Sequence, residues 1–155
     1  SSDYSSQNNT FISNMVSDNP GYGLFVRYGE NNSFTENTFS NNSIGIIIVG
    51  GERNYKIFNN YFNNSNNSRV QGSSNRYDIW NTTKQPLTNI IGGTYLGGNF
   101  WAHPDGTGFS QTCPDNNKDG ICDIEYTLNE NNTDYLPLAA TGAISPRIQD
   151  LNQER

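Results

Sequence analysis

Hydrophobic positions recur at a nearly constant spacing along the first half of the chain. Phe11, Phe34 and Ile57 share a step of 23, and Ile79 follows Ile57 with a step of 22. Three triplets recur in the same way: Asn14-Met15-Val16, Asn37-Thr38-Phe39 and Asn60-Tyr61-Phe62. Because the matches span roughly residues 8–81, we interpret this segment as an array of one repeated unit.

Each repeat predicts short strands separated by turns. Its apolar and polar residues alternate over short stretches, and its many Asn, Gly, Ser and Thr residues disfavour helix. Units of this length can stack at about 4.8 Å into parallel sheets, where one inward apolar side chain per strand is sufficient. We therefore expect an all-β fold, the C-terminal part of a right-handed, single-stranded parallel β-helix. The expected inward columns are Phe11/Phe34/Ile57/Ile79, Val16/Phe39/Phe62, Leu24/Ile46 and Val26/Ile48.

The recurrent asparagines favour a structural role. Asn14, Asn37 and Asn60 occupy one position of the repeat. Asparagine tolerates the left-handed backbone conformation of tight corners, and stacked asparagine amides can hydrogen-bond along a column. A leucine-rich repeat has a similar period, but its frame of Leu and Asn is absent.

Composition separates this chain from disordered and nucleic-acid-binding proteins. Hydrophobic residues make up only 32% of the chain, yet aromatic residues make up 12%, which favours an ordered fold. The net charge is −6, and the nine basic residues are scattered. These features argue against nucleic acid as a partner and against anionic membrane surfaces. No apolar run is long enough to insert into a membrane.

Cysteine and asparagine patterns indicate an extracellular or cell-surface location. Cys113 and Cys122 lie nine positions apart. In a secreted chain such a pair forms a disulfide, whereas in a cytosolic chain it would remain two thiols. Sequons for N-glycosylation begin at Asn8, Asn31, Asn41, Asn63, Asn66, Asn81 and Asn131. Asn- and Ser-rich sequence also generates sequons by chance.

The segment from Asp115 to Asp123 predicts a structural calcium site. Its D-x-N-x-D-G pattern places oxygen donors at alternate positions, with Gly120 at the sharp turn. The expected ligands are the side chains of Asp115, Asn117, Asp119 and Asp123 and the backbone carbonyl of Ile121. Tyr126 stands where an EF-hand has its bidentate Glu. The alternative is a surface turn that holds no ion.

Three motifs after the repeats resemble the C-terminal end of NosD-like parallel β-helix proteins, particularly those of archaeal cell surfaces. They are Gly97-Gly98-Asn99-Phe100-Trp101, the Asp/Gly loop at 115–123 and Asp134-Tyr135-Leu136-Pro137-Leu138. The resemblance implies a solenoid of the kind found in carbohydrate-binding and sugar-hydrolysing proteins. The family name is associated with copper, but one histidine, one methionine and a paired cysteine set are too few soft ligands for that metal.

The sequence favours a non-catalytic segment that serves in glycan binding, adhesion or envelope architecture. Phe25, Ile47 and Val49 form an expected outward apolar strip, and Trp101 is a further candidate contact for a sugar or partner. A tryptophan in a terminal coil can instead plug the end of the core. Expected partners are an envelope polysaccharide and other domains of the parent chain.

The alternative function is a piece of a polysaccharide hydrolase or lyase whose catalytic residues lie outside this segment or at a subunit contact. Glycoside hydrolysis needs two carboxylates about 5–10 Å apart, and no acidic column is evident in the outward strand positions. By position, we expect coils over 1–101, a C-terminal cap over 102–140 and a linker over 141–155.

Overall fold

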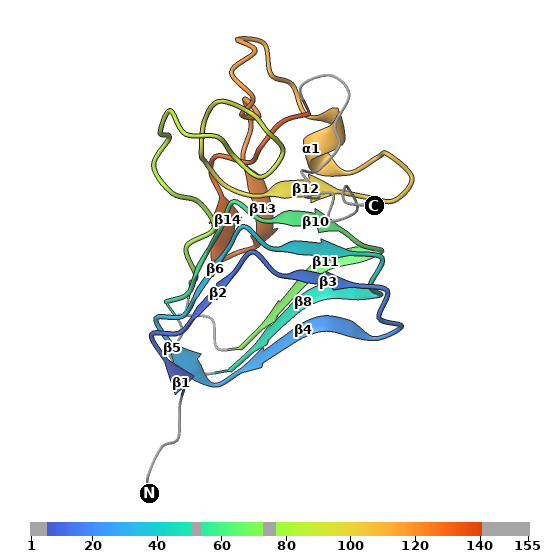
Figure 1. The fold of residues 1–155 in the computed structure, drawn as a ribbon, viewed down its shortest axis with the longest axis vertical. Coiled ribbons are helices and arrows are strands. Elements are labelled where there is room, and N and C mark those ends of the chain that lie inside the picture. Colours follow the sequence, from blue (N-terminus) through green and yellow to red (C-terminus); the bar gives the residue numbers. More distant parts are fainter. Residues whose placement is uncertain (1–5, 51–53, 73–76, 141–155) are drawn as a thin grey trace, which may run out of the picture.

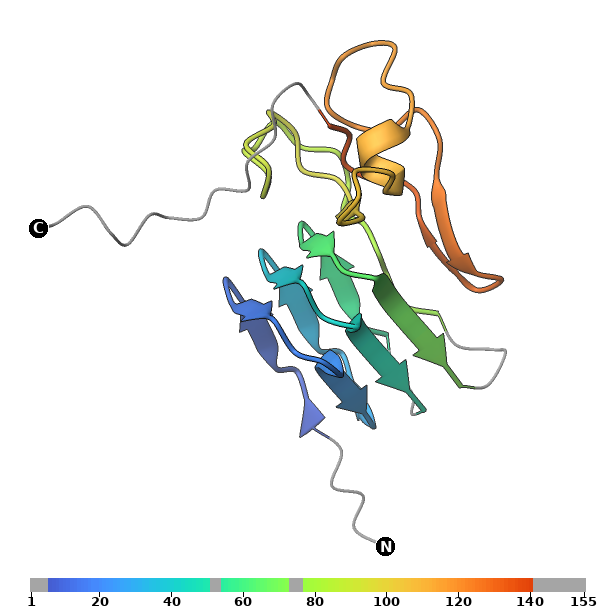
Figure 2. The ribbon, with the colours of Figure 1, turned by 90° about the vertical axis from the view of Figure 1, so that its right-hand side faces the viewer.

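The computed structural model describes residues 6–50, 54–72 and 77–140. Within these ranges the fold is all-β, with mostly parallel strands and one short helix. The N-terminal half is a stack of three coils, each contributing three strands that lie directly beside their equivalents in the next coil (Figures 1 and 2). The predicted linker at 141–155 lies outside the described residues.

Three parallel sheets form the walls of the stack. The first contains β2 (Thr10–Ile12), β6 (Ser33–Thr35) and β9 (Lys56–Phe58). The second contains β3 (Met15–Ser17), β7 (Thr38–Ser40), β10 (Tyr61–Asn63) and β12 (Phe100–Ala102). The third contains β4 (Tyr22–Arg27), β8 (Ile44–Val49) and β11 (Asn66–Gln71). A short pair joins β1 (Ser6–Gln7) to β5 (Gly29–Glu30).

The predicted columns follow the strand register. Phe11 pairs with Phe34 and Phe34 with Ile57, as their shared step in the sequence predicts. The column Val16/Phe39/Phe62 is confirmed and continues to Trp101 of β12. Leu24 lies beside Ile46 and Val26 beside Ile48. The inward side chains of the second coil are at most 6% exposed, so the columns form the core.

The prediction that Ile79 belongs to an inward column is wrong. Ile79 pairs with Lys56 rather than with Ile57, and its side chain is 40% exposed. Trp80, the next residue, is fully buried in the core. The repeat keeps its step of 23 here, so reading a step of 22 shifts the strand by one position and exchanges its two faces.

Asparagine amides form ladders along the corners of the stack. The Nδ2 group of Asn14 donates to Oδ1 of Asn37 and that of Asn37 to Oδ1 of Asn60, each at 3.0 Å. The ladder continues from Asn60 to Asn99 at 2.9 Å. A second ladder joins Asn19, Asn42 and Asn64. The predicted stacking of the asparagine amides is therefore confirmed, whereas Asn14, Asn37 and Asn60 do not adopt the left-handed conformation that was also expected of them.

In three corners of the first ladder, the left-handed residue stands one position before the ladder residue. Ser13, Glu36 and Asn59 have φ values between +55° and +58° and directly precede the ladder residues Asn14, Asn37 and Asn60. Each corner thus divides two roles between neighbours, because the residue that turns the chain is not the one whose amide enters the ladder. This arrangement explains why the turning position accepts Ser and Glu as well as Asn.

A cap covers the C-terminal end of the coils. It contains the helix α1 (Phe109–Thr112) and an antiparallel hairpin of β13 (Tyr126–Asn129) and β14 (Asn132–Asp134). Figure 2 shows this hairpin and the helix beyond the last coil. Trp80 and Trp101 lie beneath it with at most 1% of their surface exposed, which confirms that they plug the core. Cys113 and Cys122 are joined by a disulfide within the cap.

The β14 strand terminates the ladder that ends at Asn99 and a further column, in which Asp78 accepts a hydrogen bond from the backbone N–H of Tyr55. The carboxylate of Asp134 accepts hydrogen bonds from the backbone N–H of Asn99 at 2.8 Å and from the Trp101 indole at 2.9 Å. Asn132 accepts from the backbone N–H of Asp78 and from the indole of Trp80, each at 3.0 Å. Side-chain acceptors here replace the next coil that the ladders would otherwise require.

Candidate ligand pocket

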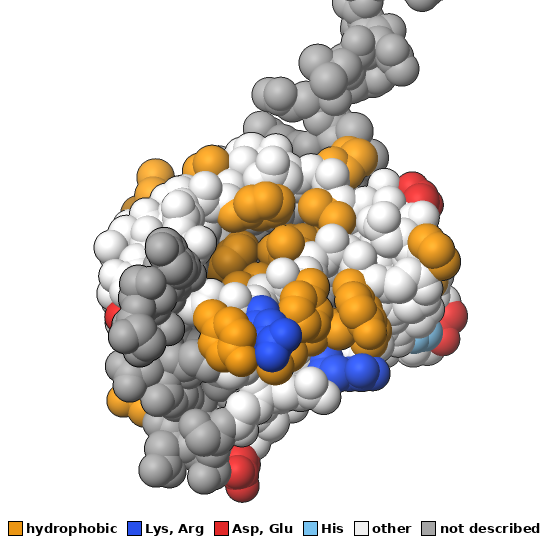
Figure 3. All heavy atoms as spheres, turned by 90° about the horizontal axis from the view of Figure 1, so that it is seen from below, with side chains coloured by type: hydrophobic (Ala, Val, Ile, Leu, Met, Phe, Trp, Pro, Cys, Tyr) orange, Lys and Arg blue, Asp and Glu red, His pale blue; other side chains and the backbone are white. Residues whose placement is uncertain are grey.

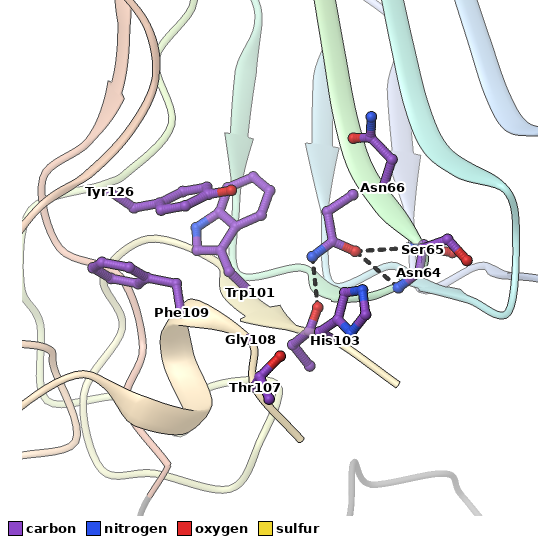
Figure 4. A pocket seen from close by; sticks show the side chains of 11 residues that line it. Asn64, Ser65, Asn66, Trp101, His103, Thr107, Gly108, Phe109 and Tyr126 are labelled. Carbon is purple, nitrogen blue, oxygen red and sulfur yellow. Dashed lines mark hydrogen bonds between the residues drawn. The ribbon is translucent and has the colours of Figure 1, made fainter. Parts of the chain in front are cut away.

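A pocket opens where the third coil meets the cap. Its volume is about 240 Å³. It lies between the start of β11, the end of β12 and the α1 and β13 segments of the cap (Figure 4). The lining residues are Asn64, Ser65, Asn66, Asn67, Trp101, Ala102, His103, Thr107, Gly108, Phe109 and Tyr126. We call this the cap pocket.

One wall of the cap pocket is aromatic. The rings of Trp101 and Tyr126 have centroids 4.8 Å apart, and those of Phe109 and Tyr126 are 4.9 Å apart. Trp101 is almost completely enclosed, whereas Phe109 and Tyr126 are half-buried. Burial raises the pKa of the Tyr126 phenol, so its hydroxyl stays protonated at neutral pH. This wall offers the partly exposed rings of Phe109 and Tyr126 together with one hydroxyl group, and Trp101 packs behind them.

The opposite wall is polar and carries no Lys or Arg. His103 is half-buried, and its Nδ1 lies 2.7 Å from Oδ1 of Asp105. The same carboxylate oxygen accepts hydrogen bonds from the hydroxyl and the backbone N–H of Thr107. These bonds, with that to His103, lower the pKa of Asp105 to about 2. The loop therefore holds His103 and Thr107 in place at the rim.

Asparagine amides complete the polar wall. Asn67 accepts hydrogen bonds from the backbone N–H and the Nδ2 group of Asn64, and donates to the carbonyl of Ala102 at 2.6 Å. The Oδ1 atom of Asn66 accepts from the backbone N–H of Ser68 at 3.2 Å. Asn66 and Ser65 are exposed, so their side chains face solvent at the mouth.

The predicted calcium site is wrong, because the oxygens of its loop serve the loop itself. Asp115 accepts hydrogen bonds from the backbone N–H groups of Asp119 and Gly120 through its two carboxylate oxygens. Asp123 accepts from the backbone and side chain of Asn116. Asn117 donates to Asp119 rather than standing as an independent ligand.

Charge in the same loop is balanced by a residue of another segment. Lys84 forms an ion pair with Asp119. Burial would raise the pKa of Asp119, but the hydrogen bonds from Lys84 and from the backbone N–H of Ile121 outweigh it and lower the pKa. Ile121 is itself buried and bridges to Leu138. No group of three or more His, Cys, Asp or Glu side chains within 6–50, 54–72 and 77–140 is arranged to hold a metal.

The predicted outward strip is only partly accessible. Phe25 is 48% exposed, but Ile47 is 3% exposed because it lies between Phe25 and Arg69 of the adjacent strands. Val49 is half-buried and pairs with Arg27. Trp101 is enclosed by Phe62, Trp80 and Tyr126, so its ring is not available as a surface contact.

The predicted glycosylation positions differ in accessibility. Those with exposed side chains are Asn8, Asn31, Asn41 and Asn66. Asn63, Asn81 and Asn131 are half-buried. Asn81 also accepts a hydrogen bond from the backbone N–H of Tyr135, which ties it to the cap. The exposed positions are therefore those that a glycan could reach most readily.

Sequence reasoning missed the cap pocket. Phe109 and Tyr126 are isolated aromatic residues in polar segments, and His103 lies in a segment that indicates only loop packing. Contacts between residues far apart in the sequence, such as Asn67 with Ala102, create the pocket, and no local pattern encodes them. The one available signal is the mixture of His, Thr and aromatic residues between 101 and 126.

The sulfur and imidazole donors among the described residues are not arranged to bind copper. His103 follows β12 at one edge of its sheet, whereas Met15 lies on β3 at the opposite edge. Both cysteines are in the disulfide. Soft copper sites need several sulfur and imidazole donors close together, and this part of the chain does not assemble them.

Comparison with known proteins links the coil stack to one family. The model of the family described as periplasmic copper-binding protein (NosD) matches residues 3–106. No curated protein and no solved structure gave a match. The family description agrees with a location in the cell envelope. Within the described residues, the single helix is far too short to cross a membrane. With its stacked parallel strands and this match over most of its length, the chain belongs to the NosD family of parallel β-helix proteins.

Proposed function

We propose that this chain is a non-catalytic, right-handed β-helix domain on the outer surface of the cell envelope that binds a neutral sugar residue of a glycan in the cap pocket. The observation that carries the proposal is the pairing of aromatic rings with uncharged hydrogen-bonding groups in one cavity. A sugar ring has an apolar face and a rim of hydroxyl groups. The aromatic wall can pack against the apolar face, and the polar wall can form hydrogen bonds with the hydroxyl groups.

The size and charge of the cap pocket narrow the ligand class. Its volume of about 240 Å³ is just below the range of roughly 300–1,000 Å³ for small-molecule pockets, which suits one or two sugar residues of a longer chain. The lining contains no Lys or Arg, and Asp105 stands beside its rim. An anionic sugar would meet the Asp105 carboxylate and would find no Lys or Arg in the lining, so uronic acids are disfavoured.

The polysaccharide-degrading alternative lacks support in the pocket. Glycoside hydrolysis requires a pair of carboxylates about 5–10 Å apart across the scissile bond. None of the residues lining the cap pocket is acidic, and Asp105 is held by Thr107 and His103. We therefore keep binding as the proposed function, with the rest of the parent chain as a further partner.

Titration with single sugars tests the proposal. The probes are N-acetylglucosamine, galactose, mannose and, as the anionic contrast, glucuronic acid, followed through the backbone amide NMR shifts. At about 0.3 kcal/mol per non-hydrogen atom, a bound hexose gains roughly 4 kcal/mol, which corresponds to a Kd on the order of 1 mM. We expect shifts at His103, Thr107 and Tyr126 with a neutral sugar and none with glucuronic acid.

Two variants make the titration specific. His103→Ala combined with Asn66→Ala should weaken binding by at least about tenfold, whereas Asn117→Ala, which is not among the lining residues, should leave it unchanged. Absence of saturable shifts with all the neutral sugars would contradict the proposal. Release of reducing ends from envelope polysaccharide would instead favour the enzymatic alternative.

A further inference from the structure

The outer face of the third sheet combines aromatic and basic side chains. In its strands β4, β8 and β11, Leu24, Ile46 and Val70 pack toward the core. Neighbouring positions of the same strands point outward, away from the core columns. We call this outer surface the arginine face, and its residues are Tyr22, Phe25, Arg27, the adjoining Tyr28, Ile47 and Arg69. Figure 3 shows hydrophobic rings and basic side chains side by side at this edge of the molecule.

The centre of the arginine face is apolar and covered. Ile47 stands between the core residues Ile46 and Ile48 in the middle strand, so its own side chain points outward. It is nevertheless buried, because Phe25 and Arg69 flank it in the strand register. A partner would therefore meet the flanking ring and guanidinium group on an apolar base, and not a cavity.

Two of the aromatic rings form a stacked pair. The ring centroids of Tyr22 and Phe25 are 6.0 Å apart, with an interplanar angle of 29°. Both residues are exposed, although their rings are large and apolar. Aromatic faces pack well against other flat apolar surfaces. The pair therefore offers a platform on which a ring-shaped group can lie.

The two arginines are spread across the sheet. The guanidinium of Arg27 lies 4.8 Å from the centroid of the Tyr28 ring and donates a hydrogen bond to its hydroxyl at 3.1 Å. Arg69 lies on β11, two strands away from β4. Because neighbouring strands are about 4.8 Å apart, roughly 10 Å separate the strands that carry the two arginines. This spread suits a polymer with several anionic groups better than a small ligand with one.

The positive charge of the arginine face is not neutralised within the described part of the chain. Over 6–50, 54–72 and 77–140, neither Arg27 nor Arg69 forms an ion pair. The strands β4, β8 and β11 contain no Asp or Glu. Asp18 and Glu30 flank β4 in the sequence but lie outside this sheet. The face is therefore locally basic on a chain whose net charge is −6.

We propose that the arginine face binds an acidic polysaccharide, with uronic acid carboxylates on Arg27 and Arg69 and sugar rings on Tyr22 and Phe25. A guanidinium group pairs with a planar carboxylate through two parallel hydrogen bonds. A sugar ring brings an apolar face that the stacked aromatic pair can cover. An acidic peptide of Asp or Glu would satisfy the arginines but has no ring for this platform, so it fits the face less completely.

Binding of defined polymers to the full chain tests the proposal. The probes are polygalacturonate, the neutral polymer dextran and polyglutamate, each followed through the backbone amide NMR shifts. We expect polygalacturonate to shift β4 and β11 and dextran to leave them unchanged. Binding should weaken as salt is added, because both guanidinium groups are exposed. Polyglutamate should bind more weakly than polygalacturonate, because it lacks sugar rings.

Two double variants with the same change in net charge isolate the site. Arg27→Gln with Arg69→Gln should weaken binding of polygalacturonate by about tenfold or more. Lys56→Gln with Lys118→Gln removes two exposed charges from β9 and from the cap, and should change it by less than about twofold. Equal losses in the two double variants would show that net charge alone attracts the polymer and would overturn the proposal.

A ring variant tests the stacked pair. Tyr22→Ala removes an exposed ring, so we expect an unchanged far-UV spectrum and binding of polygalacturonate that is weaker by about threefold or more. Tighter binding of polyglutamate than of polygalacturonate would overturn the proposal in favour of an acidic protein partner. Absence of saturable shifts with polygalacturonate would also overturn it. The residues of the arginine face do not line the cap pocket, so these results do not depend on binding of a neutral sugar there.

Discussion

At the scale of single residues, Asp134 is an ionisable group built tightly into the core. Its carboxyl group is fully buried at the end of the ladder that runs through Asn37, Asn60 and Asn99. A side chain at Gly98 would overlap it, so only glycine leaves room for the carboxyl group. The position requires a hydrogen-bond acceptor, because Asn99 and Trp101 both donate to it.

Because the Asp134 carboxyl group is buried, we expect the folded protein to lose stability as the pH rises. Burial raises its pKa to about 7 from an ordinary value of 3.8, against the opposing hydrogen bonds from Asn99, Trp101 and Leu136. Its contribution is complete below pH 3.8 and is lost as the pH rises through about 7, because the unfolded chain releases the proton more readily. We expect the free energy of unfolding to fall by about 4 kcal/mol over this range from this group.

Chemical denaturation of wild type and Asp134→Asn at several pH values between 4 and 8 measures this effect. The variant cannot titrate at this position, so the difference between the two curves isolates Asp134 from the other carboxylates. The wild type should lose stability relative to the variant as the pH rises. Parallel curves would show that the folded protein does not raise the pKa of Asp134.

At the scale of elements, the register of the segment at 79–80 decides which side chain enters the core. Ile57-Phe58-Asn59 and Ile79-Trp80-Asn81 look like equivalents, yet the strand register places Ile79 beside Lys56. An alignment with a step of 22 matches identical residues, Ile with Ile and Asn with Asn. The structure has a step of 23 instead, because this register buries the large Trp80 ring at the end of the core.

Two substitutions distinguish the registers. Trp80→Ala should cost about 3–5 kcal/mol of unfolding free energy, because it empties a fully buried site. Ile79→Ser should change it by less than about 1 kcal/mol, because the side chain is 40% exposed. Urea denaturation checks both values. A larger cost at Ile79 than at Trp80 would mean that the core is built on the other face.

At the scale of the whole molecule, internal hydrogen bonds, an ion pair and a disulfide order the cap. The 115–123 loop satisfies its carboxylates with its own backbone N–H groups and with Lys84. The disulfide between Cys113 and Cys122 closes the same loop covalently. Order here therefore comes from local hydrogen bonds and one cross-link, where the sequence pattern alone favoured a cation.

Metal removal and disulfide removal should have different effects. Addition of a calcium chelator should leave the melting temperature unchanged. Replacement of Cys113 and Cys122 by serine should lower the unfolding free energy by about 2–4 kcal/mol, because a cross-link restricts the unfolded chain. Calorimetry with and without chelator provides the comparison, and a melting temperature that calcium raises reversibly would reverse our correction of the predicted calcium site.

The sequence by itself determined the coils, since their information is local and repeated. A common step aligns Phe11 with Phe34 and Asn14 with Asn37 without knowledge of any other contact, and repetition makes each column visible several times. The disulfide pair was readable for a different reason, because paired cysteines in a secreted chain have few alternative roles.

Only the tertiary structure decided the cap. The loop pattern from Asp115 to Asp123 shows that oxygen atoms are present but does not show which groups they contact. In the structure they contact Lys84 and backbone N–H groups. The cap pocket likewise depends on Asn67 meeting Ala102 and on Tyr126 meeting Trp101 across the end of the stack. Such contacts occur once in the chain, so no repetition reveals them, and their geometry depends on how the cap packs onto the last coil.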